Sequence, residues 1–190
     1  MKIIITGFGP FGPFKINPSR IIAQKAVEKL VKDKVQAQFY DMKASIKDIN
    51  GFYENLHEDD VFVLHMGLYN GLKKLNMEDT AQNNAEFVIP DAEKEQPRNQ
   101  PIDPNQPISN KLVNSLPIDQ WVNQLSQNYD LSHDAGTYVC NYCYYRALLN
   151  VDKKIKGALF VHCGLFNDIA EDKQVDSIVQ LAHIILNHFK

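Results

Sequence analysis

Short apolar runs alternate with amphipathic segments along the first 67 residues, and this alternation constrains the fold more than any other feature. The apolar runs occupy residues 2–6, 35–40 and 61–66, and the third has the composition of a strand buried on both faces. Helical patterns occupy residues 17–30 and 45–57 between them. Because parallel strands need crossover helices, the pattern predicts an α/β fold: an open, mostly parallel sheet with helices on both faces.

The first of these helices has a clear start in the sequence. Asn17 can cap its N-terminus, and Pro18 occupies the first helical position, where a missing N–H group costs nothing. Apolar side chains then recur on one face, at positions 21, 22, 26, 27 and 30. We expect that face to pack on the sheet.

The middle of the chain has a different composition. Residues 77–109 are rich in Asn, Gln, Glu and Pro, with prolines at positions 90, 97, 101, 104 and 107. Because proline disfavours both helix and central strand, we predict a long, partly extended surface excursion here. The remaining patterns predict helices over 118–127, 138–149 and 175–189 and a buried strand over 157–162.

Length, charge and cysteine content exclude several classes of protein. The 190 residues predict a single domain over 1–190. A net charge of -3 without a basic cluster argues against a nucleic-acid partner. No apolar run approaches the roughly 18 residues that span a membrane, and the first residues are too few for a signal-peptide core. Three cysteines do not make a disulfide framework, so we expect a reducing, cytoplasmic location.

A Gly-x-Gly-x-x-Gly sequence over residues 7–12 matches the spacing of a dinucleotide-binding turn. Pro10 and Pro13 stand, however, where such a turn should open into a helix. The acidic residue is displaced as well, since Asp41 lies about 29 residues beyond Gly12, where about 20 is usual. Nucleotide binding is therefore the less favoured alternative.

Aromatic residues in the same turn favour a different ligand. Phe8, Phe11 and Phe14 recur every three residues at the carboxyl end of the first strand. A simple chain reversal does not need them. We therefore expect a small apolar ligand pocket at this turn.

Cys140 is the cysteine whose surroundings indicate reactivity. It follows the Asp-Ala-Gly-Thr sequence of residues 134–137 and opens a helix, whose N-terminus lowers a thiol pKa and can hold an oxyanion. Cys143 completes a C-x-x-C pair, but a redox motif would follow the first strand and a zinc site would need a second pair, for which only His162-Cys163 is available. We expect Cys143 and Cys163 to be core residues.

Two histidines compete for the role of a base. His162 ends the strand over 157–162, and strand carboxyl ends are where open α/β sheets bind ligands. His65 holds a similar place in the strand over 61–66, and the order of the residues does not choose between the two. Glu78, at the start of the excursion, has the ordinary expectation of a solvated acid.

Four segments carry motifs in an order known from one family. They are Thr6-Gly7-Phe8-x-Pro10-Phe11-Gly12 with Asn17-Pro18-Ser19, then Glu78-x-x-Ala81 with Ile89-Pro90-Asp91, then Asp134-Ala135-Gly136-Thr137-Tyr138-Val139-Cys140-Asn141, and then Phe160-Val161-His162. On these motifs the chain resembles the pyroglutamyl peptidase I family, cytosolic cysteine peptidases that remove N-terminal pyroglutamate. The resemblance covers nearly the whole chain, from Thr6 to His162.

The resemblance implies a role for each of these residues. Cys140 would be the nucleophile, His162 its base and Glu78 the acid that orients the imidazole. The lactam ring of the substrate would stack between Phe8 and Phe11, with Asn17 as the nearest polar group. The backbone N–H of Cys140 would stabilise the oxyanion, and neither a metal nor a cofactor is needed.

Two positions depart from the family pattern. Val88 stands where many bacterial members have an arginine, and Leu68 where glutamine is usual. Both departures concern contacts to the ring more than the triad. The expected partners are peptides with N-terminal pyroglutamate, while self-association into a homo-oligomer stays open. An inactive ligand-binding protein of the same fold is the main alternative.

Overall fold

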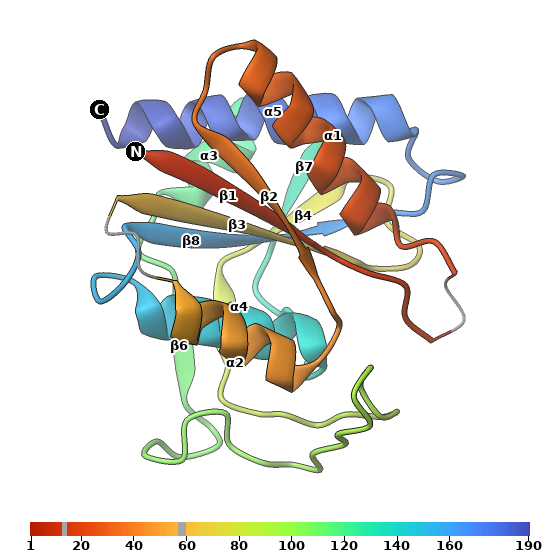
Figure 1. The fold of residues 1–190 in the computed structure, drawn as a ribbon, viewed down its shortest axis with the longest axis vertical. Coiled ribbons are helices and arrows are strands. Elements are labelled where there is room, and N and C mark those ends of the chain that lie inside the picture. Colours follow the sequence, from red (N-terminus) through yellow and green to blue (C-terminus); the bar gives the residue numbers. More distant parts are fainter. Residues whose placement is uncertain (13–14, 57–59) are drawn as a thin grey trace.

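In the computed structural model, which describes residues 1–12, 15–56 and 60–190, six strands form one sheet in the order β2-β1-β3-β8-β4-β7 (Figure 1). The strands are β1 (Lys2–Phe8), β2 (Ala37–Met42), β3 (Val61–Leu68), β4 (Leu75–Glu78), β7 (Tyr129–Ser132) and β8 (Gly157–Cys163). Phe14, expected in the pocket, and His57, expected at a helix end, lie outside the residues described.

The parallel half of the sheet confirms the sequence prediction. Strands β2, β1, β3 and β8 are neighbours and all run in parallel. Every residue of β8 is buried, as is every residue of β3 except Leu68, because helices cover both faces of these strands. The predicted bounds of β2 are shifted, since the strand begins at Ala37 rather than at residue 35.

The start of the predicted excursion is wrong. Met77 and Glu78 belong to β4, an interior strand that is antiparallel to β8 and parallel to the edge strand β7. β4 has four residues, of which Leu75 and Met77 point into the core, so its pattern is too short to be seen beside the proline-rich sequence that follows. β7 was not expected either. The sheet is mixed because β4 runs antiparallel to β8.

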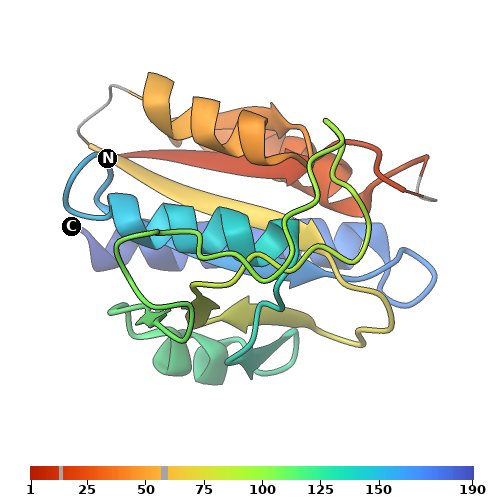
Figure 2. The ribbon, with the colours of Figure 1, turned by 90° about the horizontal axis from the view of Figure 1, so that it is seen from below.

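The rest of the excursion is irregular, as predicted, but polar side chains anchor it firmly. It begins and ends in the antiparallel pair β5 (Thr80–Gln82) and β6 (Lys111–Val113). The buried Asp91 carboxylate accepts hydrogen bonds from three backbone N–H groups, including that of Ile46. The excursion runs outside α4, on the face of the molecule that lies below the sheet in Figure 1 and faces the viewer in Figure 2.

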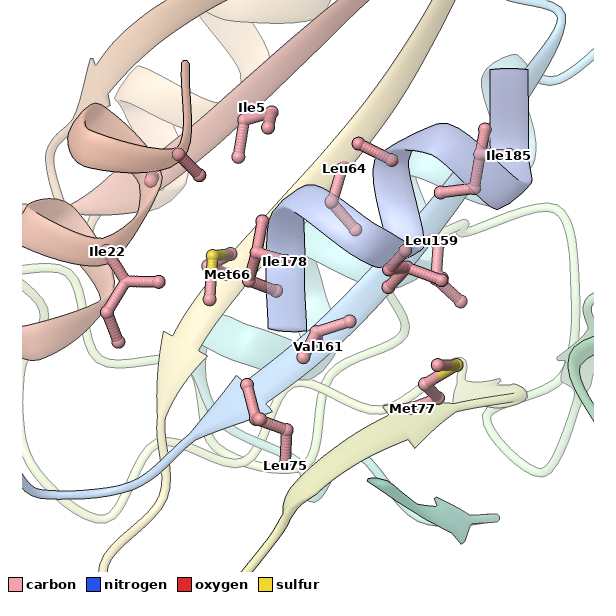
Figure 3. Close-up of a cluster of buried hydrophobic side chains, with 14 of the residues drawn as sticks. Ile5, Ile22, Leu64, Met66, Leu75, Met77, Leu159, Val161, Ile178 and Ile185 are labelled. Carbon is pink, nitrogen blue, oxygen red and sulfur yellow. The ribbon is translucent and has the colours of Figure 1, made fainter. Parts of the chain in front are cut away.

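Helices cover both faces of the sheet, as the sequence predicts (Figure 1). One face carries α1 (Pro18–Lys32), α3 (Ile118–Gln124) and α5 (Glu171–His188), and the other carries α2 (Ile46–Asn55) and α4 (Val139–Asn150). Figure 3 shows the core between the sheet and the helices α1 and α5. There Ile22 of α1 and Ile178 of α5 pack in one cluster with Leu64 and Met66 of β3. Within the described residues no helix is long and apolar enough to cross a membrane.

The predicted start of α1 is confirmed. The Asn17 side chain accepts a hydrogen bond from the backbone N–H of Ser19, and Pro18 is the first helical residue. The Ser19 hydroxyl in turn accepts from the backbone N–H of Phe8, at 3.1 Å. The end of β1 and the start of α1 are therefore held against each other directly after the turn.

Gly7 makes this close approach sterically feasible. A Cβ atom at Gly7 would lie 2.5 Å from the carbonyl oxygen of Ser19 and 2.6 Å from the Cα of Arg20. Both are backbone atoms, so neither can move aside without shifting α1. By contrast, Gly51 lies within α2 and has nothing within 4 Å of such a Cβ.

Gly7→Ala is therefore expected to destabilise the protein by about 3 kcal/mol, the cost of forcing apart two packed elements. Gly51→Ala is the matched control and should stabilise it by about 1 kcal/mol, because alanine is the better helix former. Urea unfolding followed by circular dichroism measures both changes. Equal stability of the two variants would show that the contact at Gly7 does not constrain the fold.

Candidate active site

Cys140 lies at the start of α4, as the sequence predicts. It is the second residue of the helix, which begins at Val139 after an extended cap residue, Tyr138. Gly136, with φ +80, turns the chain ahead of the helix, and its N–H donates to the carboxylate of Asp134. The first backbone N–H groups of a helix have no partner within it, so those of Val139 and Cys140 are available to a ligand.

Asn141 holds the start of α4 in place, a role that was not predicted from the sequence. Its buried side chain accepts from the N–H of Gln82 and donates to the carbonyl oxygens of Gln82 and Asn84. An asparagine in the first turn of a mostly apolar and aromatic helix was the available signal, because asparagine is a weak helix former unless its side chain has a partner.

His162 and Glu78 form a buried pair across β8 and β4. The His162 Nδ1 atom lies 2.7 Å from the Glu78 Oε1 atom, and the Glu78 side chain is 1% exposed. The ordinary expectation of a solvated acid at position 78 is therefore wrong. The antiparallel pairing of β4 with β8, in which Asn76 is opposite His162 and Glu78 opposite Phe160, brings the two side chains together.

The environment of His162 favours its protonated form. Burial alone would lower its pKa, but the hydrogen bond and charge of Cys140, followed by those of Glu78, outweigh it and raise the pKa to about 9. Because Nδ1 is bonded to Glu78, the second ring nitrogen, Nε2, is the one left to face the thiol. The structure thus brings Cys140, His162 and Glu78 together.

Gly67 leaves room for the thiol at the carboxyl end of β3. A Cβ atom there would lie 2.7 Å from the Sγ atom of Cys140 and 2.8 Å from the ring of Phe160. Gly67 is also paired with His162 in the parallel register of β3 and β8. The absence of a side chain at this position therefore lets the thiol approach the end of the sheet.

His65 is not part of this cluster. Its ring is fully buried, with Nδ1 2.7 Å from the Thr6 hydroxyl and Nε2 2.6 Å from the Tyr53 hydroxyl. Burial lowers its pKa to about 3, so the ring is neutral. Of the two candidate bases, the structure places His162 beside the thiol and makes His65 a hydrogen-bonded core residue.

The other two cysteines are core residues, as predicted. Cys143 and Cys163 are fully buried, and burial raises the pKa of both thiols. Cys143 packs against the sulfur of Met42. Across the ranges 1–12, 15–56 and 60–190, no group of three His, Cys, Asp or Glu side chains is arranged to hold a metal ion.

A pocket of about 220 Å³ opens beside Cys140. Its lining is mostly apolar and consists of Phe8, Phe11, Asn17, Ala44, Leu68, Asn70, Tyr138, Val139 and Cys140. The rings of Phe11 and Tyr138 are 5.5 Å apart and form one wall. The predicted residues Phe8, Phe11 and Asn17 thus come together with the thiol, whereas Ala44, Asn70 and Tyr138 were missed. A larger cavity of about 550 Å³, between α2 and β2, does not include Cys140.

The two polar side chains of the pocket differ in availability. Asn17 is engaged within the protein, since it donates to the carbonyl oxygen of Gly9 and accepts from the N–H and hydroxyl of Ser19. Asn70 makes no side-chain hydrogen bond to any other described residue. Leu68 lines the pocket, while Val88 is 75% exposed.

Comparison with known proteins identifies the family. A family model described as Pyroglutamyl peptidase matches residues 1–182. The chain belongs to the pyroglutamyl peptidase family. The pyrrolidone-carboxylate peptidase of Fusobacterium nucleatum is 33% identical over 172 residues, covering 85% of this chain and 77% of its own. One from Streptococcus pneumoniae is 34% identical over 176 residues, with the same coverage.

Solved structures of the pyroglutamyl peptidase family have the same fold. A mutant pyrrolidone carboxyl peptidase from Pyrococcus furiosus has a TM-score of 0.84 at 24% identity and covers both chains fully. Pyroglutamyl peptidase I from Bacillus amyloliquefaciens has a TM-score of 0.79 at 23% identity, covering 94% of this chain and 93% of its own. These findings confirm the predicted fold class, the resemblance and the class of enzyme, a cysteine peptidase.

We expect Cys140→Ser to lower the pKa of His162, because it replaces the charged thiolate by a neutral hydroxyl, whose hydrogen bond to the imidazolium is weaker, while burial remains. Glu78→Gln should lower it as well. In the wild type the protonated ring should persist until the pH passes about 9. An NMR pH titration of the imidazole carbons measures these changes, with the neutral His65 as the internal control. An unchanged titration in Cys140→Ser would contradict the contact between thiol and imidazole.

Proposed function

We propose that the chain is a cysteine exopeptidase that hydrolyses the bond after an N-terminal pyroglutamyl residue, with Cys140, His162 and Glu78 as its triad. The observation that carries this proposal is the buried 2.7 Å contact of His162 with Glu78, on an imidazole whose pKa Cys140 helps to raise. Membership of the pyroglutamyl peptidase family supports the choice of substrate.

In the first step the Cys140 thiolate attacks the carbonyl carbon that joins pyroglutamate to the next residue. This attack forms the C–S bond and a tetrahedral oxyanion; the carbonyl then re-forms, the C–N bond breaks, and His162 gives its proton to the departing amine. Water next attacks the thioester while His162 takes its proton, and the C–S bond breaks to release pyroglutamate and the Cys140 thiolate. Throughout, Glu78 holds the ring in orientation and stabilises its charged form.

The oxyanion formed in each step needs hydrogen-bond donors. We assign this role to the backbone N–H groups at the start of α4, including that of Cys140, because the thiol is on the same turn of the helix. A donor of this kind contributes about 3 kcal/mol to comparable reactions. Backbone donors do not depend on side-chain identity, so this contribution survives the replacement of the family arginine by Val88.

The pocket of about 220 Å³ suits a five-membered lactam. The rings of Phe8, Phe11 and Tyr138 offer the apolar walls for it. Since the hydrogen bonds of Asn17 are used within the protein, we assign the polar contact to Asn70, which follows Leu68 by two residues and lines the same pocket. Asn70 then takes the role expected of the family glutamine.

The domain, the substrates and the cellular location that we propose are those expected from the sequence. We infer that residues 1–190 act as one catalytic domain on pyroglutamyl peptides, in a reducing cytoplasm. The three cysteines are all unpaired thiols in the structure, which supports that location. The alternative, an inactive ligand-binding protein, would use the same pocket but would not need the buried acid behind the histidine.

Release of aminomethylcoumarin from its pyroglutamyl derivative, under reducing conditions, tests the proposed activity. Cys140→Ser and His162→Ala are expected to lower kcat/KM by at least about a thousandfold, because each removes a reacting group. Cys143→Ala is the matched control on the same helix and should retain most of the activity. If folded wild-type protein and Cys140→Ser released product at the same rate, the ligand-binding alternative would replace the peptidase.

Asn70→Ala should raise KM about five- to tenfold with little change in kcat, as expected for the loss of one hydrogen bond to the ring. Asn17→Ala is the comparison variant, which we expect to lower the free energy of unfolding by about 1 kcal/mol through loss of the α1 cap. Steady-state kinetics and urea unfolding separate the two effects. An unchanged KM in Asn70→Ala would remove Asn70 from the ring site.

A further inference from the structure

Tyr69 lies beside the catalytic imidazole but outside the ring pocket. Its flanking residues, Leu68 and Asn70, both line the pocket, whereas Tyr69 does not. The Tyr69 ring instead stands edge to face against His162, with centroids 5.5 Å apart and planes at 68°. The chain therefore presents alternate side chains to two sides of the reacting bond.

The two sides correspond to the two halves of the substrate. His162 is bonded to Glu78 through Nδ1, so Nε2 is the atom that must protonate the departing amine. The residue that carries this amine therefore has to pass close to the His162 ring, on the side away from the lactam. Two aromatic rings outside the pocket pack against the His162 ring, those of Phe160 and Tyr69. Phe160 is fully buried, so Tyr69 is the one of the two that a substrate can reach.

The Tyr69 ring is exposed on an anchored backbone. The backbone N–H of Tyr69 donates to the carbonyl oxygen of Cys163 at 2.9 Å, which continues the pairing of β3 with β8 by one residue. Tyr69 is nevertheless 56% exposed, so its ring is left uncovered beside His162. An uncovered aromatic ring is a surface suited to stacking with another apolar or aromatic group.

Other exposed apolar side chains belong to segments that border the pocket. Ile16 and Ile89 are 66% and 45% exposed. Ile16 precedes the pocket residue Asn17, and Ile89 precedes Pro90, whose carbonyl oxygen accepts from the Tyr138 hydroxyl. The segments around the pocket thus carry exposed apolar side chains in addition to Tyr69.

We propose that Tyr69 binds the residue after pyroglutamate and makes the enzyme prefer peptides whose second residue is aromatic or large and apolar. The inference rests on the proposed function and specifies which residue after pyroglutamate the enzyme prefers. Tyr69 acts as a specificity-determining contact and takes no part in moving protons.

The test compares kcat/KM for pyroglutamyl-phenylalanine amide and pyroglutamyl-glycine amide. The wild type should prefer the phenylalanine substrate by about three- to tenfold, the range of one aromatic contact. Tyr69→Ala should abolish the preference by slowing the phenylalanine substrate while leaving the glycine substrate unchanged. Tyr69→Phe, which keeps the ring, should retain it.

Three results would overturn the inference. An equal preference in the wild type and Tyr69→Ala would show that the ring does not contact the second residue. An equal fall for both substrates in Tyr69→Ala would show that Tyr69 only supports His162. If neither amide were hydrolysed in a Cys140-dependent manner, the proposed function itself would be wrong, and the inference would fall with it.

Discussion

The buried contact between Glu78 and His162 is the interaction on which the site depends. A carboxylate at 1% exposure is costly unless a charged or hydrogen-bonding partner compensates it, and the imidazole at 2.7 Å is that partner. The second oxygen of Glu78, Oε2, has no hydrogen-bond partner among the residues described. The pair thus sets the orientation of the ring, and the ring orientation decides which nitrogen faces Cys140.

The strands could be predicted where a long apolar run indicates a strand that is buried on both faces. β1, β3 and β8 have seven or eight residues, and the ranges predicted for them lie within two residues of the observed bounds. β4 and β7 have four residues each, and polar side chains alternate with apolar ones in both. Their place in the sheet comes from pairing with strands far away in the chain, which local patterns do not report.

The candidate site, too, could be predicted only in part from the sequence. The position of Cys140 at a helix start could be predicted, because a turn that contains glycine precedes an apolar run. The choice between His162 and His65 was not, since both lie near the carboxyl ends of buried strands, and only the resemblance separated them. The burial of Glu78 could not be predicted for a different reason. It depends on the pairing of β4 with β8, which carries His162, 84 residues after Glu78.

The insertion of β8 between β3 and β4 has a consequence for folding. The two strands that are neighbours in sequence are separated in the sheet, so their facing edges have no partner until residues 157–163 arrive. During synthesis the earlier strands therefore present open edges, which are templates for wrong pairing and aggregation. Closing that gap is a non-local step that sets a slow rate. The same event brings His162 to Cys140, so a chain that has not finished its sheet lacks the base that we propose for it.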